Sequence, residues 1–524
     1  MAAGIPNIRK LEAALLVNQG ELFRFGMAVL FVIVIMLFGI GQGASGPNGM
    51  LLIAAAMIGG YMALNIGAND VANNIGPAVG SHAITLGGAI AIAASFEAGG
   101  ALIAGGDVVA TIKGGIIDPA LIPDTTTYIW LMMGALLAAA LWLNLATALG
   151  APVSTTHAIV GGVLGAGIAA GGFGIANWAE VARIAASWVI SPLLGGMIAA
   201  LVLYAIKRRI TYQDDLMAAA LRTVPLLVAL MAWSFTTYLL LKGLQQVWSV
   251  GFVTATLIGL PVGGLAWLVM RRHVARSRLE VPNSKDGVNE LFTVPLICAS
   301  ALLSFAHGAN DVANAVGPLA AINDAVATGG IVTAAPIPLW VMLVGACGIA
   351  LGLALFGPRL IRTVGTEITE LDRARAFCVA LSAALTVITA SQLGLPVSST
   401  HIAVGGIFGV GFLREYLKVN YARMIEKIRL HHADADAAAV EAFLERFDAA
   451  TVRERGQMLR QMKRQPGAGR LRKKERKGLR NINRIALVKR SLLLKIAAAW
   501  LVTVPATAIA GAMIFFMLRG AMLP

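Results

Sequence analysis

Charged side chains are scarce in this sequence. Only 13% of the 524 residues are Asp, Glu, Lys or Arg, about half the share that soluble domains carry. With 58% hydrophobic residues as well, the chain does not have the composition of a soluble globular protein. This balance, with a mean hydropathy of +0.77, is typical of a membrane protein.

Cysteine is also rare. Cys298, Cys347 and Cys378 stand singly in apolar runs, without the spacing of metal ligands. We therefore expect no structural disulfide and no zinc site, and we interpret the three residues as small side chains buried between helices. The sequence also lacks HExxH and GxSxG, which argues against a hydrolytic enzyme.

Long apolar runs are what the sequence has instead. Because backbone groups in lipid must be satisfied internally and nothing alternates like a barrel, these runs predict an all-α polytopic membrane protein. Four shorter apolar segments lie at 127–149, 152–172, 375–393 and 396–413. Runs long enough to cross about 30 Å of hydrocarbon lie at 22–42, 50–80, 84–106, 179–206, 224–242, 247–270, 291–319, 337–358 and 491–519.

The net charge of +15 is concentrated in one segment. Residues 460–490 hold thirteen Lys and Arg against the single Glu475. No aromatic platform or nucleic-acid motif accompanies this charge, so we expect no nucleic-acid partner. We interpret residues 414–490 as a basic cytoplasmic loop that marks topology and contacts anionic membrane lipids. A multi-pass location in the inner (cytoplasmic) membrane of a bacterium is expected.

Two motifs occur twice, in the same order. GANDVANNIGP (67–77) agrees with GANDVANAVGP (308–318) at nine of eleven positions, and LGAPVSTTHAIVGGVLGAG (149–167) agrees with LGLPVSSTHIAVGGIFGVG (393–411) at twelve of nineteen. An ordered repeat of this kind indicates two structural units. We divide the chain into a tail with an extra helix (1–49), a first repeat (50–206), a cytoplasmic and two-helix connector (207–290), a second repeat (291–413), the basic loop (414–490) and a last helix completing the second repeat (491–524).

Charge and parity indicate how the two repeats face. Lys and Arg gather in KRRITYQDD (207–215) and RRHVARSR (271–278), which flank a two-span hairpin and therefore share the cytoplasmic side. Counting spans in both directions from this hairpin gives the two repeats opposite orientations. The sequence thus predicts an inverted repeat with broken helices, the architecture of secondary transporters.

One repeated motif interrupts an apolar segment with hydroxyl residues. PVSTTH (152–157) and PVSSTH (396–401) predict two re-entrant helical hairpins, at 127–172 and 375–413, with a proline at the start of each second helix. Each hairpin tip would be a helix N-terminus with free N–H groups and hydroxyl donors, which together favour an anion. The tip residues are Ser154, Thr155, Thr156, Ser398, Ser399 and Thr400.

The other repeated motif brings a carboxylate into the membrane. Asp70 and Asp311 each follow a Gly-Ala-Asn that can break the helix and free backbone carbonyls. An ionised carboxylate there costs several kcal/mol unless it is paired or hydrated, and oxygen ligands suit Na⁺ or a proton. Neither motif offers Lys or Arg, so an anion can join two aspartates only together with cations. We therefore predict coupled entry at one shared site.

The paired motifs resemble the PiT inorganic phosphate transporter family. GANDVAN occurs twice, with PVSTTH or PVSSTH 85–88 residues downstream, and the resemblance covers nearly the whole chain. It implies phosphate uptake coupled to Na⁺ or H⁺, twelve core helices, often a homodimer, and no cofactor. It also implies phosphate binding by the hydroxyl tips with Asn69 and Asn310, and cation binding, Na⁺ among the possible ions, by Asp70, Asp311, Asn73 and Asn314.

Other polar residues leave alternatives open. Some relatives carry a transport-associated glutamate in each half; Glu97 matches the first, whereas Ala380 stands where the second is expected. Glu97 is either a coupling site or one end of a helix–helix hydrogen bond. His157 and His401 close the tip motifs and either cap and pack the helices or relay protons. His307, next to the second aspartate motif, has a weaker indication.

The leading interpretation is a secondary active transporter that imports inorganic phosphate with Na⁺ or H⁺ by alternating access at a central site. The alternatives are a sulfate or metal–phosphate permease of the same fold and, from another class, a passive ion channel. Phosphate is favoured over sulfate because it retains protons at neutral pH and can donate a hydrogen bond to a carboxylate.

Overall fold

The computed structural model describes residues 5–41, 46–151, 153–243, 250–277, 279–332, 336–367, 371–431, 442, 445–446 and 490–522. Its regular secondary structure is helical, apart from one isolated bridge between Ile117 and Ala176. Eleven helices in these residues are long and apolar enough to cross a membrane. They coincide with the nine predicted full spans and with the first halves of the two predicted hairpins. The prediction of an all-α polytopic membrane protein is confirmed.

The helices follow the repeats along the chain. The N-terminal part consists of α1 (Ile5–Gly41), α2 (Gly46–Asn69), α3 (Val71–Gly80), α4 (Leu86–Ala104), α5 (Gly106–Gly114), η1 (Pro119–Leu121), α6 (Thr125–Ala148), α7 (Thr155–Gly171), η2 (Phe173–Ile175) and α8 (Trp178–Ile206). The middle consists of η3 (Lys207–Thr211), α9 (Leu216–Tyr238), η4 (Leu239–Gly243), α10 (Phe252–Ser277) and α11 (Lys285–Leu291). The C-terminal part consists of α12 (Thr293–Asp311), α13 (Ala313–Thr328), α14 (Leu339–Glu367), α15 (Arg373–Gln392), α16 (Ser399–His431) and α20 (Arg490–Met522).

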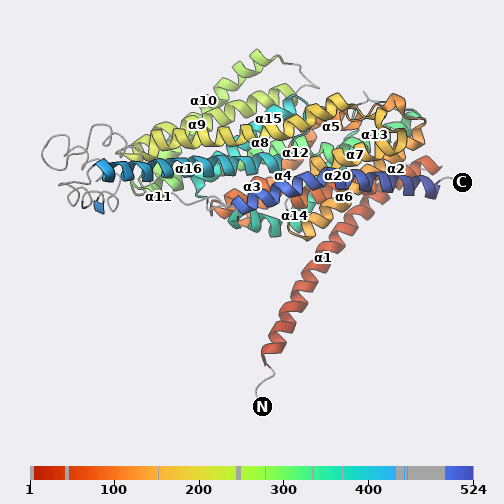
Figure 1. Ribbon diagram of the computed structural model, residues 1–524, viewed down its shortest axis with the longest axis horizontal. Coiled ribbons are helices and arrows are strands. Elements are labelled where there is room, and N and C mark those ends of the chain that lie inside the picture. Colours follow the sequence, from red (N-terminus) through yellow and green to blue (C-terminus); the bar gives the residue numbers. More distant parts are fainter. Residues whose placement is uncertain are drawn as a thin grey trace.

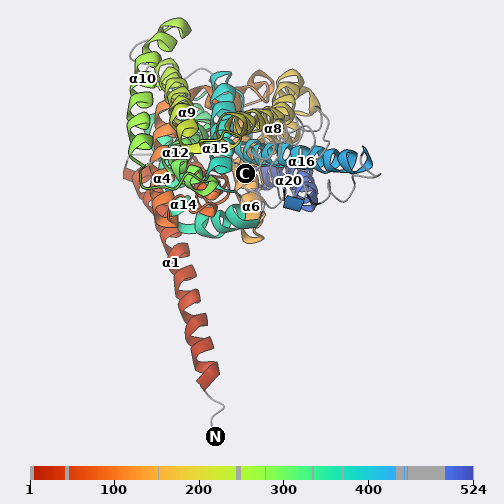
Figure 2. The same cartoon turned by 90° about the vertical axis from the view of Figure 1, so that its left-hand side faces the viewer.

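Helix α1 projects from the bundle formed by the other helices, as Figures 1 and 2 show from two directions. It packs against α2 and α14 at one end. Its described side chains are mostly apolar and exposed, with Leu22 70% and Phe23 65% accessible. An exposed apolar surface of this kind suits contact with lipid hydrocarbon.

Helices of each half pack against helices of the other half, and the contacts occur in equivalent pairs. Helix α2 of the first half packs on α14 of the second, and α12 of the second half packs on α4 of the first. In the same way α7 packs on α20, while α16 packs on α8. Glycines allow the close approach: a Cβ on Gly67 would meet the carbonyl oxygen of Ile349, and a Cβ on Gly100 would meet that of Phe305. Each half therefore completes the core of the other.

The predicted helix breaks are present but limited to one residue. Asp70 separates α2 from α3, and Val312 separates α12 from α13, both with right-handed helical backbone angles. The Asp70 N–H still donates to the carbonyl of Ile66 at 2.9 Å. The Asp70 carbonyl accepts instead from the backbone N–H and the side-chain amide of Asn73, at 3.0 and 3.1 Å. The break thus redirects one carbonyl without unwinding the helix.

Two expectations from apolar runs need correction. Cys298 and Cys347 are exposed, and only Cys378 is buried, because an apolar run does not distinguish a lipid-facing side from an interior side. Pro396 lies in the loop before α16 and not at the first position of that helix, because Ser398 takes the capping position. Its counterpart Pro152 lies outside the described residues.

The segment after the second repeat begins as a helix. Helix α16 continues to His431, beyond the predicted hairpin end at residue 413. The basic run predicted at 460–490 lies outside the described residues, except for its last residue, Arg490, where α20 begins. The opposite orientation of the repeats in a membrane, the re-entrant character of the hairpins and the segment boundaries stay predictions.

Candidate functional site

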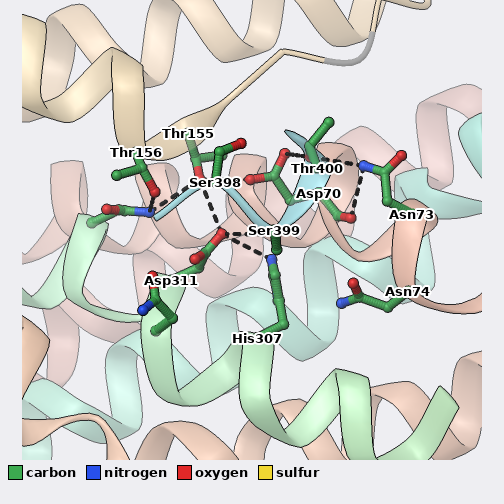
Figure 3. Close-up of polar contacts among 12 residues, drawn as sticks. Asp70, Asn73, Asn74, Thr155, Thr156, His307, Asp311, Ser398, Ser399 and Thr400 are labelled. Carbon is green, nitrogen blue, oxygen red and sulfur yellow. Dashed lines mark hydrogen bonds and ion pairs between the residues drawn. The ribbon is translucent and has the colours of Figure 1, made fainter. Parts of the chain in front are cut away.

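The loops between α6 and α7 and between α15 and α16 meet beside the two helix breaks (Figure 3). The predicted tip residues and both aspartates are buried there, with Asp70 1% and Asp311 0% exposed. Residues from positions 70, 155, 311 and 400 thus lie within hydrogen-bonding distance of one another, although they come from both halves of the chain. The predicted convergence of the repeats on one site is present.

Hydroxyl groups of both tips contact the carboxylates. The Thr155 hydroxyl donates to Asp70 Oδ2 at 2.6 Å and lies 3.4 Å from Asp311 Oδ2. From the other tip, the Thr400 hydroxyl lies 3.1 Å from Asp70 Oδ1, and the Ser399 hydroxyl lies 3.4 Å from Asp311 Oδ2. Each aspartate therefore contacts one tip of its own half and one tip of the other half. Thr156 is nearby but donates to the carbonyl of Val397 at 3.0 Å.

The asparagines that follow the aspartates cross between the halves. Asn73 Nδ2 donates to the Thr400 hydroxyl at 2.8 Å. Asn314 Nδ2 donates to the hydroxyls of Thr155 and Thr156 at 3.0 and 3.2 Å. The amide oxygens of both asparagines are buried without a hydrogen-bond donor, and so is Asp311 Oδ1. These orphaned atoms are all oxygens, the ligands that hard cations prefer.

The asparagines that precede the aspartates hold the tip loops. Asn69 donates from Nδ2 to the Thr147 hydroxyl at 3.0 Å, and its Oδ1 accepts from the Val153 N–H at 3.2 Å. Asn310 repeats this pattern with the Ser391 hydroxyl at 2.9 Å and the Val397 N–H at 3.2 Å. Both ends of each amide are thus engaged in positioning a tip. A phosphate contact of these two residues stays a prediction.

The first hydroxyl residue of each tip caps the helix that follows. Ser154 Oγ accepts the N–H of His157 at 3.1 Å, and Ser398 Oγ accepts the N–H of His401 at 3.3 Å. These are N-cap bonds, which satisfy one otherwise free donor at the start of α7 and of α16. The two histidines then meet across the interface between the halves, with ring centroids 4.4 Å apart and nearly perpendicular planes. His157 also packs on Trp188 at 3.8 Å.

A buried chain of titratable groups extends from one aspartate only. His307 lies with Nε2 3.0 Å from Asp311 Oδ2 and with Nδ1 2.6 Å from Glu97 Oε2. Asn74 Nδ2 donates to the other Glu97 oxygen at 2.9 Å. Glu97 therefore does form a helix–helix contact, and that contact leads to the site. His307 had only a weak indication in the sequence analysis, and Asn74 was not singled out. The i, i+4 spacing of His307 and Asp311 on one helix face is the signal that could have identified the histidine.

Among the described residues, no equivalent series of titratable groups extends from Asp70 in the other half. A Cβ on Gly308 would meet the backbone of Glu97, and a Cβ on Gly67 would meet that of Ile349, so Ile349 takes the place of Glu97. Ile66 likewise precedes Gly67 where His307 precedes Gly308. The expectation that Ala380 stands at the counterpart of Glu97 therefore needs correction: Ala380 is buried on α15, whereas Ile349 of α14 occupies the equivalent packing position. The two positions behind Asp311 thus hold a histidine and a glutamate, whereas the equivalent positions behind Asp70 hold two isoleucines.

The electrostatics of the site are those of a cation-attracting cluster. One ligand atom each of Asp70, His307 and Asp311 lies within 4.8 Å of the others. Among the described residues, no Lys or Arg forms an ion pair with Asp70, Asp311 or Glu97; the imidazole of His307 is the basic group in contact with Asp311 and Glu97. Two carboxylates without a lysine or arginine at this depth need a positive ion or a proton.

Comparison with known proteins covers both halves and the site. A "Putative phosphate permease" of Helicobacter pylori strain J99 is 52% identical over 522 residues, which is 98% of each chain. A protein of the same description from Pyrococcus horikoshii is 40% identical over 372 residues, 70% of this chain and 90% of its own. A solved structure called "The sodium-dependent phosphate transporter" is 31% identical with a TM-score of 0.74, covering 90% of this chain and 100% of that chain. Residues 66–511 match the phosphate transporter family, and this range contains all the site residues above. The chain therefore belongs to the phosphate transporter family.

Proposed function

We propose that this chain imports inorganic phosphate across the bacterial inner membrane, coupled to Na⁺ or H⁺, by alternating access at the buried site between the two halves. Membership of a phosphate transporter family supports phosphate as the anion. The name of the solved neighbour, a sodium-dependent phosphate transporter, favours Na⁺ as the coupling ion. The cation is here a transported substrate, since the proposal needs no resident cofactor.

One observation carries the coupling: buried side-chain oxygens of the two aspartate motifs lack a hydrogen-bond donor. They are the side-chain oxygens Asn73 Oδ1, Asn74 Oδ1, Asn314 Oδ1 and Asp311 Oδ1. A buried acceptor that lacks a partner costs about 1–3 kcal/mol, and oxygen atoms of this kind are the ligands that a hard cation prefers. The unpaired groups are therefore those that Na⁺ binding would complete, with Asp70 and Asp311 supplying the charge.

The hydroxyl donors of the two tips explain how cation binding would favour phosphate binding. The hydroxyls of Thr155, Ser399 and Thr400 now point to carboxylate oxygens. If a cation binds the carboxylates, these hydroxyls can rotate to donate to phosphate, together with the first N–H groups of α7 and α16. If no cation binds, phosphate would meet two carboxylates and few free donors. Cation binding thus prepares the anion site, which is the physical basis of symport.

The burial of the site favours a transporter over a passive channel. Asp70, Asp311, Thr155 and Thr400 are at most 1% exposed, so neither side of the membrane has open access in this structure. An open pore would leave its charged residues in contact with water. Because the site is closed between two interlocked halves, the halves must move relative to each other before ions can enter. Alternating access requires a movement of this kind.

Uptake of labelled phosphate into proteoliposomes tests the proposal. Wild-type protein is expected to accumulate phosphate against its gradient when a Na⁺ or a proton gradient is imposed, and not when both are collapsed. Sulfate in excess is expected to compete weakly. Uptake that only equilibrates phosphate, whatever the cation gradient, would indicate a passive channel. Strong competition by sulfate, or uptake only with divalent metal present, would favour the sulfate or metal–phosphate permease.

Further features of the assembly stay proposals. A homodimer, contact of the basic loop with anionic lipids, and a division into inverted repeats all follow from the sequence and from the resemblance. The exchanged packing of α2 on α14 and of α12 on α4 supports the two repeats. Crosslinking of single cysteines placed in the 207–215 and 271–278 loops, from each side of the membrane, tests the orientation.

A further inference from the structure

A small cavity of about 110 Å³ lies away from the central site, among the ends of α8, η3, α9, α11 and α15. Helix α11 lies at the end of the bundle toward which α16 extends (Figure 1). The Lys and Arg excess of the flanking segments predicts that this end faces the cytoplasm. The polar side chains that line the cavity, which we call the basic cavity, are Lys207, Thr211, Lys285, Asn289, Asp372 and Arg375.

The lining carries more positive than negative charge. Three of these side chains are cationic, and Asp372 is the single carboxylate. Asp372 already accepts the N–H of Arg375 at the start of α15 and lies 3.2 Å from the guanidinium of the same residue. This one carboxylate therefore serves Arg375 first, and the lining still carries three cationic side chains against it.

Lys207 is the most demanding of these groups. Its side chain is only 9% exposed, and no carboxylate of the described residues lies within 4.0 Å of its ammonium, while the Tyr212 ring lies 6.0 Å away. Arg375, Arg414 and Lys285 disfavour its charge, and Asp372 offsets them only in part. A buried ammonium among other cations costs several kcal/mol unless a counter-charge joins it.

We infer that the basic cavity is a cytoplasmic binding site for a phosphate-type oxyanion. An ammonium and a guanidinium are the preferred partners of such an anion, and Thr211 adds a hydroxyl donor. Asn289 accepts the N–H of Ala374 through Oδ1 at 3.1 Å, which leaves its amide NH₂ group as a donor. A volume of about 110 Å³ exceeds the roughly 30 Å³ that one water occupies in the liquid, so a tetrahedral oxyanion fits.

An anion in the basic cavity would join three parts of the chain. Lys207 and Thr211 lie at the start of the connector, directly after α8 of the first repeat, Lys285 and Asn289 lie at its end, and Arg375 lies in the first turn of α15 of the second repeat. An anion bound in the basic cavity should therefore stabilise the present arrangement of these helix ends. The phosphate group could belong to free phosphate in the cytoplasm or to the headgroup of an anionic lipid. The inference does not depend on the function proposed for the central site.

Thermal unfolding of the full-length protein in detergent tests the site. Inorganic phosphate, exchanged for chloride at constant ionic strength in a Na⁺-free buffer, is expected to raise the unfolding temperature saturably. Lys207→Gln and Arg375→Gln should each raise the phosphate concentration for half of this effect at least about tenfold, since a charged hydrogen-bond partner is lost. Lys207→Arg should keep the effect within about threefold.

The matched control is Arg209→Gln, which removes the same charge from an exposed residue of the same turn, η3. It should change the half-saturating concentration by less than about twofold. If Lys207→Gln does not fold, Lys285→Gln replaces it, because Lys285 is exposed. Equal phosphate dependence in the wild type, the cavity variants and the control would overturn the inference, and so would equal protection by chloride.

Two further experiments are needed. One distinguishes free phosphate from a lipid headgroup, and the other excludes a contribution from the central site. In lipid discs that contain phosphatidylglycerol with phosphatidylcholine, a headgroup site predicts that the lipid protects wild type but not Lys207→Gln, and that added phosphate has no further effect. A site for free phosphate predicts the same phosphate effect as in pure phosphatidylcholine discs. Repeating the titration with Asp70→Asn, which disables the central site, should leave the Lys207-dependent effect in place; its disappearance would overturn the inference.

Discussion

The two sides of the central site are alike at the tips and unlike behind the aspartates. Asp70 and Asp311 each contact a hydroxyl of either tip, and Asn69 and Asn310 hold the two tip loops with the same pair of bonds. Behind Asp311, however, His307 links to Glu97 at 2.6 Å, whereas Ile66 stands in the corresponding place behind Asp70.

This comparison distinguishes the part of the site that both halves share from the part that only one half has. Under the proposed symport, the repeated part would supply what each half contributes to binding an anion together with cations. The branch through His307 and Glu97 makes the environments of the two carboxylates unequal. If the proposed cations bind these two carboxylates, the inequality would let them bind in order, because Asp311 has an imidazole 3.0 Å away and Asp70 is held by hydroxyl groups.

The largest expected effect comes from the aspartates themselves. Asp70→Asn or Asp311→Asn should reduce gradient-driven phosphate uptake in proteoliposomes at least about 100-fold, because each removes a charge that the coupling ion must neutralise. The protein should still reach the membrane in normal amounts. Asp214→Asn, at an exposed position outside the site, is the control. Normal uptake by both site variants would show that the assignment is wrong.

The next effect tests the asymmetric branch. Glu97→Gln and His307→Gln should each lower uptake about tenfold or more, because breaking a buried pair leaves the other group without its charge partner. The double variant should be little worse than either single variant, since the two residues act as one unit. Ile349→Val, at the position that corresponds to Glu97, is the matched control. Additive losses in the double variant would argue against a shared role.

A smaller effect distinguishes the two tips. Thr155 contacts both carboxylates, whereas Thr400 contacts only Asp70. Thr155→Val should therefore lower phosphate affinity more than Thr400→Val, by roughly an additional tenfold, the equivalent of about 1.4 kcal/mol. Thr155→Ser, which keeps the hydroxyl, should restore most of the affinity. Binding of labelled phosphate to purified protein measures all three; equal losses for the two valine variants would contradict the central place of Thr155.

The smallest effect is expected at the caps, and it should be symmetric. Ser154→Ala and Ser398→Ala each remove an N-cap bond of the same kind, at 3.1 and 3.3 Å. Each should lower the free energy of unfolding by about 1 kcal/mol. Thermal unfolding in detergent checks this against Ser81→Ala, a partly exposed hydroxyl outside the tips. A lower stability for only one of the two cap variants would show that the two caps are not equivalent.

Much of the fold and of the repeated site could be predicted from the sequence. The apolar runs gave the spans because hydrocarbon thickness sets their length, and the doubled motifs placed Asp70, Thr155, Asp311 and Thr400 near one another before any coordinates. Two copies of a motif with unpaired carboxylates have few physical explanations other than a shared site. The repeat therefore carried three-dimensional information that a single motif would not.

The asymmetric part could not be predicted in the same way. Glu97 lies on α4 and His307 on α12, and only the exchanged packing of these helices brings them together. No repeat marks this contact, because the other half has Ile349 and Ile66 instead. For the same reason the exposed sides of Cys298 and Cys347 and the cavity around Lys207 depended on packing and not on the local pattern.

The most direct test of the account measures phosphate binding to purified protein as a function of Na⁺ concentration and, separately, of pH. If the carboxylates admit phosphate only with cations, Na⁺ or protons should raise phosphate affinity by about tenfold or more, and phosphate should raise affinity for that same cation by an equal factor. Asp70→Asn should abolish this mutual effect. A phosphate affinity that is independent of both Na⁺ and pH in the wild type would contradict the account.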